Sequence, residues 1–114
     1  MLQQFTIENF LSFKDREVFK LQPGKGSRNK MHKVEPVKGQ WILKSAALFG
    51  PNAGGKSNFV EALELGKRLV LLGTRAETLI EYHPFRLSSE CKNKDTTITY
   101  QILCNNKKYE YGFS

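Results

Sequence analysis

Eight consecutive residues carry the clearest chemistry in this chain: Gly50-Pro51-Asn52-Ala53-Gly54-Gly55-Lys56-Ser57. The segment fits the pattern G-x-x-x-x-G-K-[ST] without exception. Its glycines let the backbone curl, so that successive N–H groups converge on a phosphate chain at the start of a helix. The lysine would place a positive charge against the β- and γ-phosphates, and the serine hydroxyl would reach a magnesium ion that bridges them. The segment therefore predicts a site for a nucleotide with Mg²⁺.

A strand before this loop and a helix after it would hold it in place. Residues 42–49, Ile-Leu-Lys-Ser-Ala-Ala-Leu-Phe, are largely apolar and end at a Gly-Pro pair, which predicts a buried strand that enters the loop. From Ser57 to Leu72 apolar residues recur at steps of three and four, which predicts an amphipathic helix. Gly73 is a suitable stop for it. The motif thus lies between a strand and a helix, which is the context it requires.

The other segments predict a sheet that carries this helix. Residues 3–10 alternate between apolar and polar side chains, and residues 17–21 form a short partner that would return antiparallel. Residues 97–104 and 109–113 alternate again around an Asn-Asn turn, as a hairpin would. We expect an α/β fold with a mixed sheet: antiparallel N-terminal strands, a central strand before the loop, one main helix after it and a C-terminal β-hairpin. Residues 74–94 give mixed signals and no prediction.

Length and composition limit the number of domains, the kind of partner and the location that we expect. The chain has 114 residues, which fits one small domain or part of a larger one, and its net charge of +7 favours polyanionic partners. The longest strongly apolar run, residues 69–72, is too short to span a bilayer, and no leader pattern opens the chain, so we expect a cytoplasmic protein without a membrane partner. Cys91 and Cys104 have no metal-ligand spacing, and we interpret them as ordinary thiols.

A basic segment precedes the predicted strand. Residues 22–40 contain glycines and prolines, and they scatter five basic side chains around the single acid Glu35. The five are Lys25, Arg28, Lys30, Lys33 and Lys38. We predict a loop, and two interpretations of it stay open: a solvated surface that keeps the protein soluble, or a surface that contacts nucleic-acid phosphates.

Several other residues invite a functional interpretation but have a simpler one. His83 could act as a base, yet its position beside Pro84 in an unassigned stretch favours a structural or solvated histidine. Lys67, Arg75 and Arg86 could touch DNA or a partner subunit, or could be solvated charges. The aromatic residues of the C-terminal hairpin could stack on single strands, but alternating aromatics in a hairpin are typical of a core. They are Tyr100, Tyr109, Tyr111 and Phe113.

Two stretches carry a family resemblance. Residues 5–15, Phe-Thr-Ile-Glu-Asn-Phe-Leu-Ser-Phe-Lys-Asp, and residues 48–63, which contain the phosphate loop, resemble the start of an ABC-type ATPase head. The likeness is to the SMC/RecF/OLD group, and within it to AAA-family ATP-binding proteins of bacterial anti-phage and abortive-infection systems. Residues 83–87 and 109–114 are also similar to that narrower set. The Asn-Phe-x-Ser-Phe opening makes this resemblance more specific than the phosphate loop alone.

The resemblance implies a P-loop NTPase that binds ATP and Mg²⁺ and hydrolyses ATP in the full-length protein. It implies heads that form a homodimer around ATP and gate a DNA-associated or phage-defence effector, such as a nuclease. The positions that match nucleotide contacts are Gly50, Asn52, Gly54, Gly55, Lys56, Ser57 and Asn58, with Ser57 also the magnesium ligand. Ser12, Phe13 and Lys14 match an early loop near the nucleotide, although an ordinary turn would also explain Ser12 and Lys14.

The chain also departs from that family. An ABC head needs an Asp-Glu strand end, a signature loop and a switch histidine, and no Asp-Glu pair occurs before Ser114. We therefore expect residues 1–114 to be a single partial domain, the N-terminal lobe of a head, which cradles phosphates but lacks a general base and is inactive alone.

Two other functions stay open. In the first, the phosphate loop is vestigial and residues 25–38 bind nucleic acid or a partner. In the second, the chain is a small GTPase or kinase, which the late position of the motif disfavours.

Overall fold

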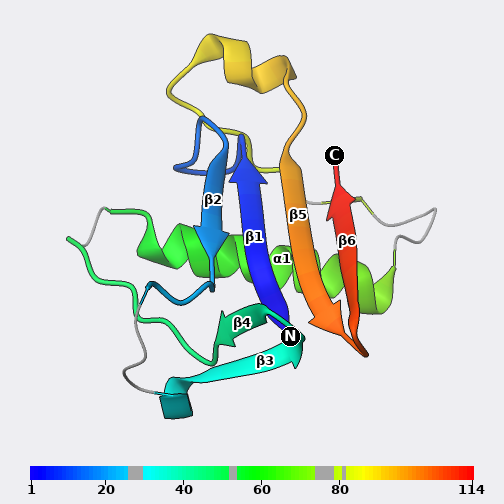
Figure 1. Cartoon of the computed structure of the whole chain (residues 1–114). Helices are drawn as coiled ribbons and strands as arrows, with labels where there is room; N and C mark the ends of the chain where they lie inside the picture. The colour runs from blue at the N-terminus through cyan, green and yellow to red at the C-terminus, as the bar shows by residue number, and fades with distance from the viewer. Residues whose placement is uncertain (26–29, 52–53, 74–78, 81) are drawn as a thin grey trace.

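The protein is an α/β unit in which one helix lies across an antiparallel sheet (Figure 1). The computed structural model describes residues 1–25, 30–51, 54–73, 79–80 and 82–114. The strands are β1 (Leu2–Glu8), β2 (Glu17–Lys20), β3 (Lys33–Val37), β4 (Gln40–Leu43), β5 (Thr97–Cys104) and β6 (Lys107–Phe113). The main helix is α1 (Lys56–Leu72), and two short 3-10 helices are η1 (Lys30–His32) and η2 (Ser89–Asn93).

Four strands form the main sheet in the order β2-β1-β5-β6, and every neighbouring pair is antiparallel. Phe5 on β1 pairs with Phe19 on β2 and with Tyr100 on β5. Since side chains alternate along a strand, this register gathers the aromatic residues of three strands on one face. The strands β3 and β4 form a separate two-stranded sheet at one end of the main sheet (Figure 1).

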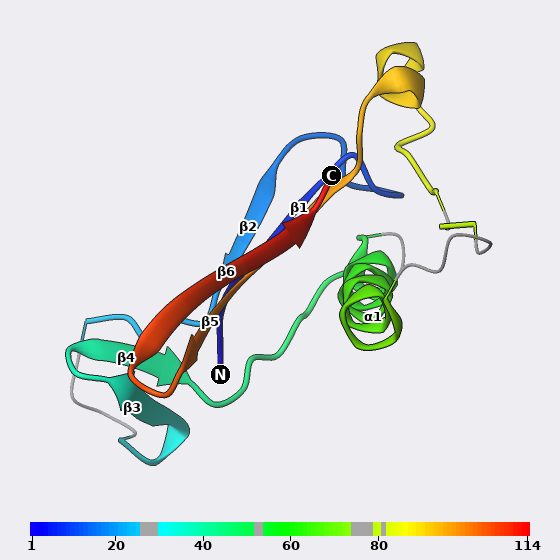
Figure 2. The same cartoon turned by 90° about the vertical axis from the view of Figure 1, so that its right-hand side faces the viewer.

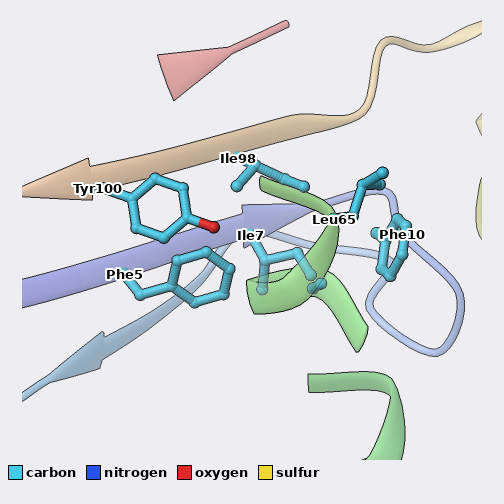
Figure 3. Packing of buried hydrophobic residues seen from close by; sticks show 7 residues of the cluster. Phe5, Ile7, Phe10, Leu65, Ile98 and Tyr100 are labelled. Atoms are coloured by element: carbon cyan, nitrogen blue, oxygen red, sulfur yellow. The ribbon is translucent and has the colours of Figure 1, made fainter. Parts of the chain in front are cut away.

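The helix α1 covers one face of the main sheet (Figure 2). Ala62, Leu65 and Gly66 are its buried residues, and they lie at the helical spacing that points them to one side. Ala62 and Leu65 belong to one core cluster with residues of the sheet side, and Figure 3 shows Leu65 among them. The buried sheet-side members are Phe5, Ile7, Phe10, Ile98 and Tyr100.

Tyr100 fixes where the helix crosses the sheet. Its hydroxyl donates a hydrogen bond to the carbonyl oxygen of Leu63 at 2.9 Å. A Cβ at Gly66 would overlap the Tyr100 ring, so the helix approaches this closely only because residue 66 is glycine. Burial, and next the nearby charge of Glu64, raise the pKa of Tyr100 to about 12. The middle of α1, at Leu63 and Gly66, is thereby held in a defined place on the sheet.

Several sequence predictions are confirmed. The helix predicted over 57–72 is α1, the N-terminal strand pair is β1–β2, and the C-terminal hairpin is β5–β6. Its turn has Asn105 and Asn106 at φ of 50° and 61°, the positive values expected for asparagine.

Tyr109 and Tyr111 are not core residues. Both are about half exposed, at 49% and 51%, because β6 is an edge strand whose residues are almost all exposed. Phe113 stacks edge-on against Tyr111, with ring centroids 5.2 Å apart, instead of joining the core. The prediction of buried aromatics therefore holds for Tyr100 and is wrong for Tyr109 and Tyr111.

The predicted strand before the phosphate loop is largely wrong. The strand β4 ends at Leu43, and residues 45–50 are not in a strand. Phe49 is 92% exposed, and no described residue partners the backbone of residues 45–49 by a hydrogen bond. An apolar segment becomes a strand only when another strand satisfies its N–H and C=O groups, and none of the described strands lies beside this one. The expected mixed sheet is accordingly two antiparallel sheets.

The basic segment 22–40 is also more ordered than the predicted loop. It contains η1 and β3, which pairs with β4 through a turn at Gly39, where φ is 79°. Val34 and Val37 lie half-buried in this strand, which gives it an apolar component. Among the described residues, no helix combines the length and apolar character needed to cross a membrane.

Candidate nucleotide-phosphate site

The phosphate loop, residues 50–57, contains a glycine that the backbone geometry requires. Gly55 immediately precedes α1 with φ of 86° and ψ of 6°, the left-handed region that side chains disfavour. A Cβ on Gly55 would lie only 2.9 Å from the hydroxyl oxygen of Ser12. Residue 55 therefore needs glycine for two separate reasons, its backbone angle and its crowding against another loop.

The first turn of α1 presents backbone donors. No acceptor for the N–H groups of residues 55–58 is found among the residues that the structure describes. The helical ladder begins with Phe59, whose N–H donates to the carbonyl oxygen of Gly55 at 2.9 Å. No acidic side chain lies in this first turn and no side chain caps it. Oriented N–H groups and the positive end of the helix dipole favour an anion here.

Lys56 lies across the loop. Its ammonium group donates to the carbonyl oxygens of Gly50 and of Pro51, the latter at 2.8 Å. The N–H of Gly54 donates to the same Pro51 oxygen at 2.9 Å, so one loop donor has an internal partner. An ammonium has three donors, which leaves one for a ligand while the lysine keeps both contacts. Asn52 lies outside the described residues.

A second loop, residues 10–14, follows β1 and contacts the phosphate loop. Phe10 and Phe13 exchange two backbone hydrogen bonds, of 2.9 and 2.8 Å, across a tight turn in which Leu11 has φ of 47°. The turn presents Ser12, whose hydroxyl accepts a hydrogen bond from the Asn58 side-chain amide at 3.0 Å. The Ser12 proton is therefore available for another acceptor. We call residues 10–14 the early loop.

The structure thus brings together some of the predicted site residues and not others. Ser12, Gly55 and Asn58 are in contact, and Lys56 and Ser57 follow Gly55 in the first turn of α1. Lys14 is exposed, and no described residue is hydrogen-bonded or ion-paired to its side chain. Ser57 is exposed.

Asn9 fixes the early loop to the interior of the protein, a role that the sequence did not predict. Its buried side-chain amide donates to the carbonyl oxygens of Cys91 and Lys94, at 2.9 and 2.8 Å. Its side-chain oxygen accepts from the N–H of Phe85 at 3.0 Å, and its carbonyl oxygen accepts from the Thr96 hydroxyl at 2.7 Å. Asn9 also has φ of 51°, which asparagine tolerates well. It therefore joins the early loop to the segment that contains η2.

His83 lies beside the same loop. Its ring meets the Phe10 ring edge-on, with centroids 6.3 Å apart, and its carbonyl oxygen accepts from the N–H of Leu11 at 2.8 Å. These contacts fit a structural histidine. Lys67 and Arg86 are exposed, and Arg75 lies outside the described residues.

A magnesium ion would find few protein ligands here. The described part of the chain holds no group of three or more His, Cys, Asp or Glu side chains suited to a metal. The Ser57 hydroxyl can supply one ligand, and phosphate oxygens and water would have to supply the others, as Mg²⁺ in phosphate sites commonly accepts. The residues present fit a metal that arrives with a nucleotide.

No relative of known function or structure was found that would indicate the role of this site. The chain matches no protein-family model, no curated protein and no solved structure. Its site is therefore defined by the contacts of the phosphate loop, the early loop and the first turn of α1.

Proposed function

We propose that the chain binds ATP with Mg²⁺ through residues 50–57, as part of an ABC-type ATPase head with a P-loop NTPase fold. The observation that carries this proposal is the start of α1, where Gly55, at a φ of 86°, leads into a first turn without a side-chain cap, and where the Lys56 ammonium lies on the carbonyl oxygens of Gly50 and Pro51. The free N–H groups of a helix start and an ammonium group are donors that suit a phosphate chain. ATP hydrolysis, head dimerisation and control of a DNA-associated or phage-defence effector belong to the same proposal for the full-length protein.

Each group has a role in binding. The N–H groups of residues 55–58 surround the β-phosphate, and Lys56 spans the β- and γ-phosphates while its carbonyl contacts hold it over the loop. Ser57 offers its hydroxyl to the magnesium ion. Ser12, already fixed by Asn58, adds a hydroxyl at the rim of the site.

The test is calorimetric titration of Mg²⁺ and ATP into the wild type and into Lys56→Ala. Loss of a charge-assisted contact to phosphate should weaken binding by roughly 10- to 100-fold. Lys67→Ala is the matched control, because it removes one charge from an exposed position on the same helix, and it should bind like the wild type. Equal affinity in the wild type and Lys56→Ala would refute the proposal.

The preference for ATP or GTP distinguishes the proposed ATPase head from the small GTPase that the sequence leaves open. We expect ATP to bind at least as tightly as GTP in a competition experiment. A strong preference for GTP would favour the small GTPase instead.

A further inference from the structure

The positive charge of this chain is concentrated in one region. Residues 20–44 contain seven basic side chains and one acidic one, a surplus of six in a chain whose whole surplus is seven. In the rest of the chain, basic residues outnumber acidic residues by only one. The seven are Lys20, Lys25, Arg28, Lys30, Lys33, Lys38 and Lys44. Such segregation makes a local positive potential much stronger than the net charge suggests.

Hydrogen bonds join the described segments of this region into one structural unit. The N–H of Leu43 donates to the carbonyl oxygen of Leu21 at 2.7 Å, and the N–H of Lys44 donates to that of His32 at 2.8 Å. Lys33 on β3 pairs with Leu43 on β4. Residues 20–25 and 30–44 thus form a unit, which we call the basic hairpin. It lies at one end of the main sheet, away from α1 (Figures 1 and 2).

Most of its charges are exposed and uncompensated. No ion pair involves Lys20, Lys25, Lys30, Lys38 or Lys44 within the part of the chain that is described, where Arg16 and Glu8 form such a pair. All five of these lysines are exposed. The single acid, Glu35, accepts a hydrogen bond from the N–H of Gly39 and so closes the β3–β4 turn.

An aromatic ring stands among these charges. Trp41 is 41% exposed on β4, and the Lys33 ammonium lies 5.2 Å from the centre of its ring. Lysines with an exposed aromatic ring are the combination that binds single-stranded nucleic acid, because phosphates meet the ammonium groups and a base stacks on the ring.

We propose that the basic hairpin binds the sugar-phosphate backbone of a nucleic acid. Its described charges are spread over the strand pair and its ends: Lys33 lies on β3, Lys38 lies in the turn that joins β3 to β4, and Lys44 directly follows β4. This suits a linear polyanion. A membrane would need a continuous apolar face, whereas the large apolar side chains exposed in the described hairpin are Met31 and Trp41. This activity does not require the phosphate loop to be vestigial.

The test compares two variants that each lose four positive charges. The first carries Lys25→Gln, Lys30→Gln, Lys38→Gln and Lys44→Gln, and the control carries Lys92→Gln, Lys94→Gln, Lys107→Gln and Lys108→Gln. All eight lysines are exposed, and the control positions lie outside the basic hairpin. Binding of a labelled single-stranded oligonucleotide and of its duplex is measured by fluorescence anisotropy, from about 50 to about 200 mM salt. Near-UV circular dichroism checks that both variants stay folded.

Loss of four phosphate contacts should flatten the plot of log affinity against log salt by about 3 in the hairpin variant. The control should keep the wild-type slope. Equal slopes in the two variants would overturn the proposal, as would binding to anionic lipid vesicles through the hairpin lysines with no binding to either oligonucleotide. Lys56→Ala should bind the oligonucleotides like the wild type, so the outcome does not depend on ATP binding.

Discussion

The phosphate loop and the basic hairpin both present positive charge, but they are built in opposite ways. Around the phosphate loop several described groups have specific contacts: Gly55 lies against Ser12, the Asn58 amide donates to the Ser12 hydroxyl, and Asn9 holds the early loop from the interior. The basic hairpin has one fully buried large side chain, Ile42, and carries its lysines on the surface. A site for one phosphate chain depends on positions, whereas a site for a polyanion depends on charge density. Single substitutions should therefore act steeply at the first and gradually at the second.

The largest effect should come from Asn9→Ala. The change leaves the carbonyl oxygen of Cys91 without its partner in a buried setting, and the N–H of Phe85 and the carbonyl oxygen of Lys94 without theirs in part-buried settings. Such a loss costs about 1–3 kcal/mol for a buried group and less for a part-buried one, so we expect the free energy of unfolding to fall by about 3 kcal/mol. Urea denaturation measures it.

Asn106→Ala is the control for the backbone angle at Asn9. Asn106 also has a positive φ, of 61°, but it is exposed in the β5–β6 turn. It should lose only about 1 kcal/mol. If the two variants unfold at the same urea concentration, the Asn9 hydrogen bonds do not stabilise the protein.

The sequence predicted more of the phosphate loop than of the basic hairpin. Periodicity predicted α1, and alternation predicted β1 and β5, because these elements each bury one regular face. The glycine and lysine positions of the phosphate loop follow from a motif with a local mechanism. The family resemblance implied only that the early loop lies near the nucleotide; the hydrogen bond between Ser12 and Asn58 was not predicted, since it joins residues 46 positions apart.

Other features depend on partners that no local pattern reveals. Asn9 bonds to residues 76 to 87 positions away, so its role could not be predicted from its neighbours. The segment 45–49 has the composition of a strand, but composition does not show whether a neighbouring strand exists. The strand β3 was hidden by the glycines and prolines around it, although Val34 and Val37 gave a weak signal.

Gly55→Ala against Gly39→Ala compares the two regions directly. Both glycines have a positive φ, 86° and 79°, so alanine is strained at either position by about 1 kcal/mol. At Gly55 the new Cβ also meets the Ser12 hydroxyl at 2.9 Å, whereas at Gly39 nothing lies within 4 Å. We expect Gly55→Ala to lose about 2 kcal/mol of stability and at least about 10-fold in ATP affinity.

Gly39→Ala should lose about 1 kcal/mol of stability, through backbone strain alone, and keep its ATP affinity. Thermal unfolding and the same calorimetric titration measure the two quantities. Equal losses of ATP affinity in the two variants would mean that contact between the early loop and the phosphate loop has no part in nucleotide binding.

The smallest effects should come from Ser12→Ala and Lys14→Ala, which separate the two early-loop candidates. Ser12→Ala removes the bond to Asn58, an exposed contact, so stability should change by no more than about 0.5–1 kcal/mol. If the Ser12 proton meets a phosphate oxygen, ATP affinity should fall about 5- to 10-fold, because a neutral hydrogen bond contributes about 1 kcal/mol. Lys14→Ala should leave ATP affinity within about twofold at moderate salt, because no described contact holds the Lys14 side chain near the phosphate loop. Calorimetric titration of both variants decides between them, and a larger loss in Lys14→Ala would assign the early-loop contact to its charge and not to the fixed hydroxyl of Ser12.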